Sequence, residues 1–207
     1  VEYMAGSARP FTIGDLLHHT AGFVTDDPWG DRQQPLPETE FTKLLRAGVP
    51  FSTSPGTRYE YSNFGYATLD RIITNVSKQD YAERVEATVL KPLDMASTRY
   101  EVRDVPPGKL AMGYRWENDA WSPEPVMPHG AFGAMGGLVT TGKDYAKWIG
   151  YLLSAWPAKD SEPQNAKTIR AMQYGGGMLH SRRRPGKAGD GGVQAHRVVR
   201  IGRKTRR

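Results

Sequence analysis

The chain has 207 residues, with 28 lysine and arginine residues against 22 aspartate and glutamate residues, and no cysteine. This length fits one domain of moderate size or part of a larger one. The absence of cysteine excludes a disulfide framework, a cysteine-ligated zinc site and a thiol nucleophile. No apolar run reaches the length of a membrane-spanning helix, so the sequence predicts none. The chain begins at Val1 without an initiator methionine, and we therefore expect a piece of a longer protein.

The net charge of +6 is unevenly distributed along the chain. Residues 181–207 hold ten lysine and arginine residues and a single acid, whereas residues 1–180 carry a net charge of −3. The C-terminal stretch has no aromatic residue except histidine, so it buries too little apolar surface to offset the entropy of ordering. We therefore expect a folded part over residues 1–175 and a disordered, Gly/Arg-rich basic tail over residues 176–207.

Periodicity and capping signals predict four helices in the first half of the chain. The first covers residues 13–19 and begins with a capping box of Thr12 and Asp15. The second covers residues 38–47 and ends at a glycine. Apolar residues at steps of three and four predict two more helices, over residues 64–76 and 79–89.

The second half of the chain reads as extended segments, a glycine-rich loop and one further helix. Short-strand positions are expected between residues 95 and 126, at Tyr100, Val102, Tyr114, Trp116 and Trp121. Their spacing favours aromatic side chains in the core. Glycines then crowd residues 129–137. A second capping box, Thr141 with Asp144, opens a helix whose apolar face is Tyr145, Trp148, Ile149, Leu152 and Leu153.

The phrase Tyr61-Ser62-Asn63 stands between a Pro-Gly turn and the predicted third helix. A tyrosine at a helix N-terminus can serve as a general base, because the helix dipole favours the phenolate. An asparagine two residues later could orient a substrate carbonyl or a lysine. The alternative is structural, since Asn63 is also a suitable helix cap.

Four phrases in order give this motif a context: Phe11-Thr-Ile-Gly-Asp-Leu-Leu-His-His-Thr-Ala-Gly-Phe23, Pro55-Gly-Thr-Arg-Tyr-Glu-Tyr-Ser-Asn-Phe-Gly-Tyr66, Leu90-Lys-Pro-Leu-Asp-Met-Ala-Ser-Thr98 and Gly136-Gly-Leu-Val-Thr-Thr-Gly-Lys-Asp-Tyr-Ala-Lys147. Together they resemble the serine β-lactamase-like family of class C β-lactamases, DD-peptidases and related esterases, over about residues 9–153.

The resemblance implies an α+β fold, an α/β sandwich joined to a helical lobe. In this chain we expect that fold to be incomplete and helix-dominated, with apolar surface left exposed where the sheet would pack. It also implies acyl-enzyme hydrolysis of a small-molecule β-lactam, D-alanyl peptide or short ester, with no cofactor and no metal. Tyr61 matches the family's proton-shuttling tyrosine and Asn63 its asparagine. The phrase His18-His-Thr-Ala-Gly22 matches a stretch that serves as a structural turn, so we assign it to packing.

Two motifs of the family are missing from the sequence. No serine has a lysine three residues later, so the Ser-x-x-Lys nucleophile is absent, and no Lys/His-x-Gly phrase follows residue 153 in a suitable context. We therefore expect the chain to be inactive by itself. A non-catalytic relative that binds ligands is the alternative. Nucleic-acid binding through the basic tail is a further one, although the tail has no aromatic side chain on which bases could stack.

Overall fold

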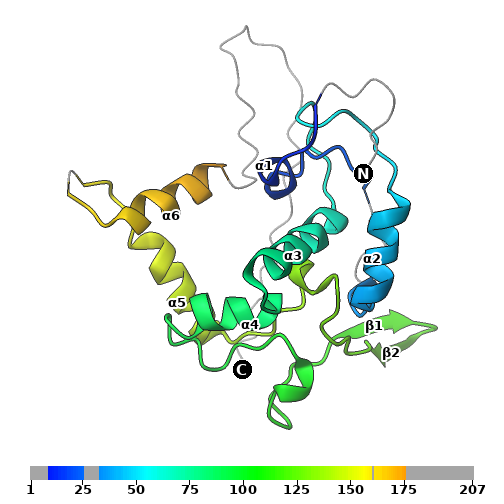
Figure 1. Ribbon diagram of the computed structural model, residues 1–207. Helices are drawn as coiled ribbons and strands as arrows, with labels where there is room; N and C mark the ends of the chain where they lie inside the picture. The colour runs from blue at the N-terminus through cyan, green and yellow to red at the C-terminus, as the bar shows by residue number, and fades with distance from the viewer. Residues whose placement is uncertain (1–8, 26–32, 160, 176–207) are drawn as a thin grey trace, which may run out of the picture.

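The computed structural model describes residues 9–25, 33–159 and 161–175 (Figure 1). The predicted tail, residues 176–207, lies outside the described residues. The helices are α1 (Ile13–Leu17), α2 (Glu38–Ala47), α3 (Asn63–Ser77), α4 (Tyr81–Val85), α5 (Gly142–Leu153) and α6 (Gln164–Gly175). A π-helical turn η2 (Glu86–Leu90) continues α4, and two 3-10 turns are η3 (Val102–Asp104) and η4 (Gly133–Met135). The strands β1 (Tyr114–Glu117) and β2 (Ala120–Pro123) form an antiparallel hairpin.

Helix α1 is short and firmly capped. Thr12 and Asp15 form the predicted capping box, and Asp15 also receives two hydrogen bonds from the Arg9 guanidinium, at 2.7 and 2.8 Å. The Arg9 guanidinium holds the pKa of this carboxyl well below its usual range. The helix ends at Leu17, earlier than the predicted 13–19, because His19 adopts a left-handed conformation with φ of 55°.

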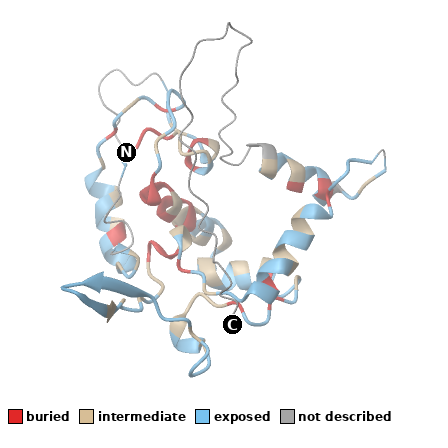
Figure 2. Ribbon diagram, turned by 180° about the vertical axis from the view of Figure 1, so that it is seen from behind, coloured by how far each residue is buried: buried red, intermediate tan, exposed pale blue. Residues whose placement is uncertain are grey.

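The core gathers around α3. Its centre is a cluster of phenylalanine rings in edge-on and tilted contact, in which Phe64 of α3 lies 5.1 Å from Phe23 and 5.4 Å from Phe41. Phe132, beside η4, packs against Phe41 at 5.3 Å. Figure 2 shows the buried residues concentrated along α3 and the segments beside it. A second, smaller cluster joins the end of α5 to α6 through Ala155, Ala166 and Ile169.

The hairpin differs from its prediction. Trp116 pairs with Trp121 across β1 and β2, with ring centroids 5.3 Å apart. Its turn residues, Asn118 and Asp119, both have positive φ, as a two-residue hairpin turn of the primed type requires. Both strands are solvent-exposed, so the prediction that these tryptophans are core residues was wrong. Val102, also expected in a strand, begins the 3-10 turn η3.

Helix α5 begins as predicted, but its second capping box forms only in part. Thr141 accepts the hydrogen bond from the Asp144 amide at 3.2 Å. The Asp144 carboxylate accepts instead from the Ser97 amide at 2.7 Å and the Thr98 hydroxyl at 3.0 Å. The carboxylate thereby ties the first turn of α5 to the loop after η2.

Candidate functional site

Tyr61 and Asn63, the two predicted site residues, meet at the N-terminus of α3. The Tyr61 hydroxyl donates a hydrogen bond to Asn63 Oδ1 at 2.9 Å. The helix cap is Ser62, whose Oγ accepts from the Gly65 amide at 3.2 Å, so the alternative that Asn63 caps the helix is wrong. Asn63 is buried, whereas the Tyr61 side chain is 43% exposed. The phenol is therefore held by a hydrogen bond at its hydroxyl, while the residue as a whole is partly exposed to solvent.

The segment that carries Tyr61 is tied to the turn after α1. The Glu60 amide donates to the His19 carbonyl at 2.8 Å, and the Ser62 amide donates to His19 Nδ1 at 3.2 Å. The His19 ring stacks on Tyr66 at 5.0 Å and lies 4.7 Å from the Tyr61 ring. The turn at residues 18–22, predicted to be structural, thus hydrogen-bonds to the residues before and after Tyr61 and contacts the Tyr61 ring.

Glu60 fixes the same segment from its other side. One carboxylate oxygen accepts from the Ser52 hydroxyl at 2.6 Å, and the other accepts from the amide and the hydroxyl of Thr25, both at 3.2 Å. The hydrogen bond from Ser52 is the main reason that the pKa of Glu60 is lowered. This side chain joins three separate segments immediately beside Tyr61.

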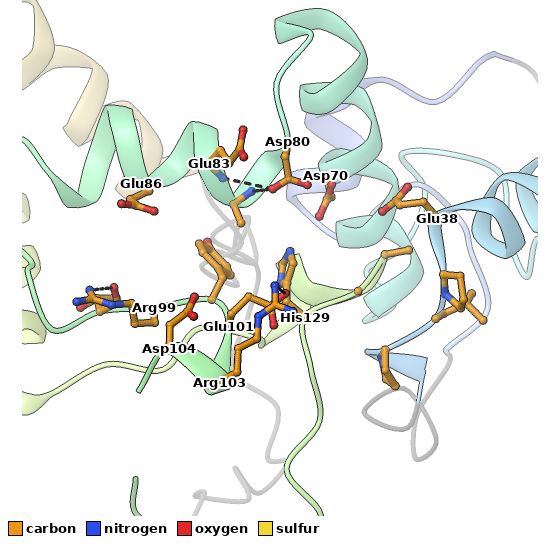
Figure 3. A pocket seen from close by; sticks show the side chains of 18 of the residues that line it. Glu38, Asp70, Asp80, Glu83, Glu86, Arg99, Glu101, Arg103, Asp104 and His129 are labelled. Atoms are coloured by element: carbon orange, nitrogen blue, oxygen red, sulfur yellow. Dashed lines mark hydrogen bonds and ion pairs between the residues drawn. The ribbon is translucent and has the colours of Figure 1, made fainter. Parts of the chain in front are cut away.

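An acidic cavity of about 560 Å³ lies elsewhere, between the N-terminus of α2, the helices α3 and α4, and residues 98–104 and 129–131 (Figure 3). Neither Tyr61 nor Asn63 is among the residues that line it. Seven carboxylates and two arginines line it. Glu101 and Asp104 lie on the same side as Arg99 and Arg103 (Figure 3), and the other carboxylates are Glu38, Asp70, Asp80, Glu83 and Glu86.

Asp70, which is buried, and His129, which is partly buried, have shifted pKa values in this cavity. Burial, reinforced by the nearby carboxylates of Glu38 and Asp80, raises the pKa of Asp70 to about 7. Burial lowers the pKa of His129, whose Nδ1 has no hydrogen-bond partner among the described residues. Neither residue carries a sequence motif, and sequence reasoning missed both.

Within the described part of the chain, no group of three or more histidine, aspartate or glutamate side chains is arranged to hold a metal ion. Over the same residues, no helix has both the length and the apolar character needed to cross a bilayer. The chemistry that the described site offers is that of a positioned phenol and its amide partner.

Comparison with known proteins identifies the family of the chain. A family model described as Beta-lactamase matches residues 2–198. The chain belongs to the beta-lactamase family. The match runs beyond Gly175 into the basic segment, so the boundary between folded part and tail stays a prediction.

Solved beta-lactamase-fold structures resemble the model. The octameric penicillin-binding protein homologue from Pyrococcus abyssi superposes with a TM-score of 0.62 and 25% identity, covering 79% of this chain and 38% of that one. A class C beta lactamase from Rhodobacter sphaeroides gives 0.57 and 25%, covering 82% and 45%. These likenesses confirm the predicted fold class, an incomplete, helix-dominated α+β fold.

Protein flp of Staphylococcus aureus (strain COL) is 28% identical over 155 residues, or 72% of this chain. The chain spans 30% of the length of flp. Membership of the beta-lactamase family supports a serine hydrolase-like function in general.

Proposed function

We propose that this chain is the tyrosine-bearing lobe of a serine hydrolase that cleaves a β-lactam, D-alanyl peptide or short acyl ester through an acyl-enzyme. Tyr61 is the proton shuttle and Asn63 its partner. The observation that carries the proposal is the hydrogen bond from the Tyr61 hydroxyl to Asn63 Oδ1 at the N-terminus of α3. Family membership supplies the reaction class.

The position of Tyr61 suits a group that gains and loses a proton. The amide dipoles of α3 favour negative charge at its N-terminus and so favour the phenolate. Asn63 accepts from the phenol through Oδ1, and its side-chain amide also has an N–H₂ group. A rotation of that amide would let it donate to the phenolate, so one partner can serve both protonation states.

The proposed step moves one proton each way. The serine Oγ–H gives its proton to the Tyr61 phenolate as Oγ bonds to the substrate carbonyl carbon. Tyr61 then gives the proton to the leaving nitrogen or oxygen as the bond from the carbonyl carbon to that atom breaks. Residues 1–207 contain no Ser-x-x-Lys phrase, so we place the nucleophile outside this sequence and propose that the chain alone is inactive.

The test uses a parent protein in which this lobe is joined to a Ser-x-x-Lys segment. Tyr61→Phe should lower the acylation rate by about 10²–10⁴-fold, the range for a general acid–base group, in a stopped-flow assay with a chromogenic substrate. Tyr59→Phe is the matched control, because Tyr59 is a similarly exposed tyrosine two residues away. Unchanged acylation in Tyr61→Phe, or an equal loss in Tyr59→Phe, would remove Tyr61 from the mechanism.

A further inference from the structure

His19 holds the backbone on both sides of Tyr61. The amides of Glu60 and Ser62, the residues before and after the tyrosine, both donate to His19, one to its carbonyl at 2.8 Å and the other to its Nδ1 at 3.2 Å. The contact joins residues 43 positions apart in the sequence. One residue thus fixes the direction in which the chain enters α3.

The imidazole is itself held in place. The turn that carries it is closed by the His19 amide donating to the Leu16 carbonyl at 3.3 Å and the Thr20 amide donating to the Asp15 carbonyl at 2.8 Å. The left-handed backbone of His19, with φ of 55°, turns the chain back toward residues 59–62. Stacking on Tyr66 of α3 orients the ring.

The bond to Ser62 requires one particular form of the imidazole. To accept from an N–H donor, Nδ1 must be unprotonated, which in the neutral ring puts the proton on Nε2. The Ser62 residue is only 3% exposed, so little solvent could replace this acceptor.

We propose that His19 is a positioning residue for the Tyr61 phenol, acting through the Ser62 amide that its Nδ1 accepts. The expected effect of His19 on catalysis rests on the proposed function of Tyr61. Its effect on the backbone at Ser62 is argued from the contacts of His19 alone. The ring of His19 packs against its neighbours, which is the role expected from the sequence. Its Nδ1 holds the Ser62 amide, and substitutions can separate these two roles.

Two variants of the 207-residue chain make that separation. In His19→Asn, the amide oxygen can take the place of Nδ1, and asparagine tolerates left-handed backbone. In His19→Phe, the ring remains and the acceptor is lost. The readout is amide hydrogen exchange at Ser62, with the Glu60 amide as internal reference because its acceptor is a backbone carbonyl. Circular dichroism establishes that each variant is folded.

We expect exchange at Ser62 to be at least tenfold faster in His19→Phe than in the parent chain, and close to the parent rate in His19→Asn, with Glu60 unchanged in both. Ser62 protection that survives in His19→Phe overturns the proposal, as does equal loss in a folded His19→Asn. If His19→Phe does not fold, the Asn variant decides by itself, because retained Ser62 protection supports the proposal and lost protection overturns it.

Kinetics in the parent protein with the Ser-x-x-Lys segment test the catalytic meaning. His19→Phe should lower kcat at least tenfold with little change in KM, and His19→Asn should restore most of it. If His19→Phe speeds exchange at Ser62 but leaves kcat unchanged, His19 does not position Tyr61 for catalysis. If Tyr61→Phe itself leaves kcat unchanged, the proposed function fails, whatever the exchange at Ser62 shows.

Discussion

Asp70 is a carboxyl group that the fold keeps away from water and close to other acids. It is 4% exposed, and it accepts a long hydrogen bond from the Thr74 hydroxyl at 3.4 Å. Glu38 and Asp80 add repulsion to the cost of burial, and the pKa rises to about 7. The native state therefore retains a proton that the unfolded chain, with an aspartate pKa of about 3.9, has already lost.

Asp70 makes the free energy of unfolding depend on pH. Between about pH 4 and pH 7 the folded state binds more protons at Asp70 than the unfolded state, so this group lowers the free energy of unfolding as pH rises, by up to about 1.4 kcal/mol per pH unit. Asp70→Asn removes the charge and keeps an acceptor for Thr74. We expect it to raise the melting temperature at pH 8 and to raise it much less at pH 5.

Thermal melts of Asp70→Asn at the two pH values measure this difference. Glu83→Gln, a neutralised acid that is exposed and lines the same cavity, is the control and should give little change at either pH. A gain of equal size at pH 5 and pH 8, or no gain, would contradict the assignment.

Sequence patterns pointed to some residues of the candidate site, and they missed others there and in the acidic cavity. The motif found Tyr61 and Asn63, because a short phrase places the two side chains within three residues of each other. His19 was read as packing, because its bond to Ser62 spans 43 residues and a single sequence does not display that contact. Asp70 and His129 lack any motif, and only the folded chain brings them to one cavity.

At the scale of elements, two glycines with positive φ lie in different surroundings, Gly48 at the end of α2 and Gly22 in the turn after α1. Gly48, with φ of 83°, follows α2 and has open space where a Cβ would lie. Gly22, with φ of 87°, follows the α1 turn, and a Cβ there would collide with the Thr53 carbonyl. The two positions share a positive φ and differ in crowding.

That difference predicts unequal costs for the same substitution. Gly48→Ala should lower the free energy of unfolding by about 1 kcal/mol, the cost of a left-handed backbone with a Cβ. Gly22→Ala should cost more than twice as much, because the backbone at residues 51–53 must also move. Urea unfolding of both variants measures this, and equal costs would show that residues 51–53 yield freely.

Local signals predicted the elements well where capping and periodicity agree. The helix at residues 38–47 was confirmed to the residue, and the capping box of Thr12 and Asp15 forms as expected. The predicted helix over 79–89 is α4 followed by the π-helical η2. Helix α6 was missed because its buried positions, Ala166 and Ile169, are too few to give a clear period.

For the molecule as a whole, large apolar side chains remain exposed on several helices, α1 and α5 among them. Ile13 and Leu17 of α1 are 56% and 44% exposed, and Leu153 of α5 is 61% exposed. The sequence had predicted exposed apolar surface where a sheet would pack. The chain spans 30% of flp and 38% of the Pyrococcus homologue, and the proposal that it is one lobe of a longer protein would account for this exposed surface.

A lobe that lacks the Ser-x-x-Lys nucleophile should form no acyl-enzyme. Incubation of the purified 207-residue chain with a fluorescent penicillin, and with an activated-ester probe, should leave no covalent label after denaturation. The parent protein with a Ser-x-x-Lys segment is the positive control. Stoichiometric labelling of one serine in this chain, located by mass spectrometry and abolished by its replacement with alanine, would refute the proposed inactivity.

Because the cluster between the end of α5 and α6 is small, we expect this part of the described chain to open separately from the core around α3. Ala155, Ala166 and Ile169 form a core far smaller than the phenylalanine cluster around α3, and Figure 1 shows α6 apart from α2 and α3. A unit with so few buried apolar contacts opens at a lower free energy than the whole. The indole of Trp156 donates a hydrogen bond to Gln173 of α6, so its environment should change when α6 opens. The environment of the rings around Phe64 should change only when the core around α3 unfolds.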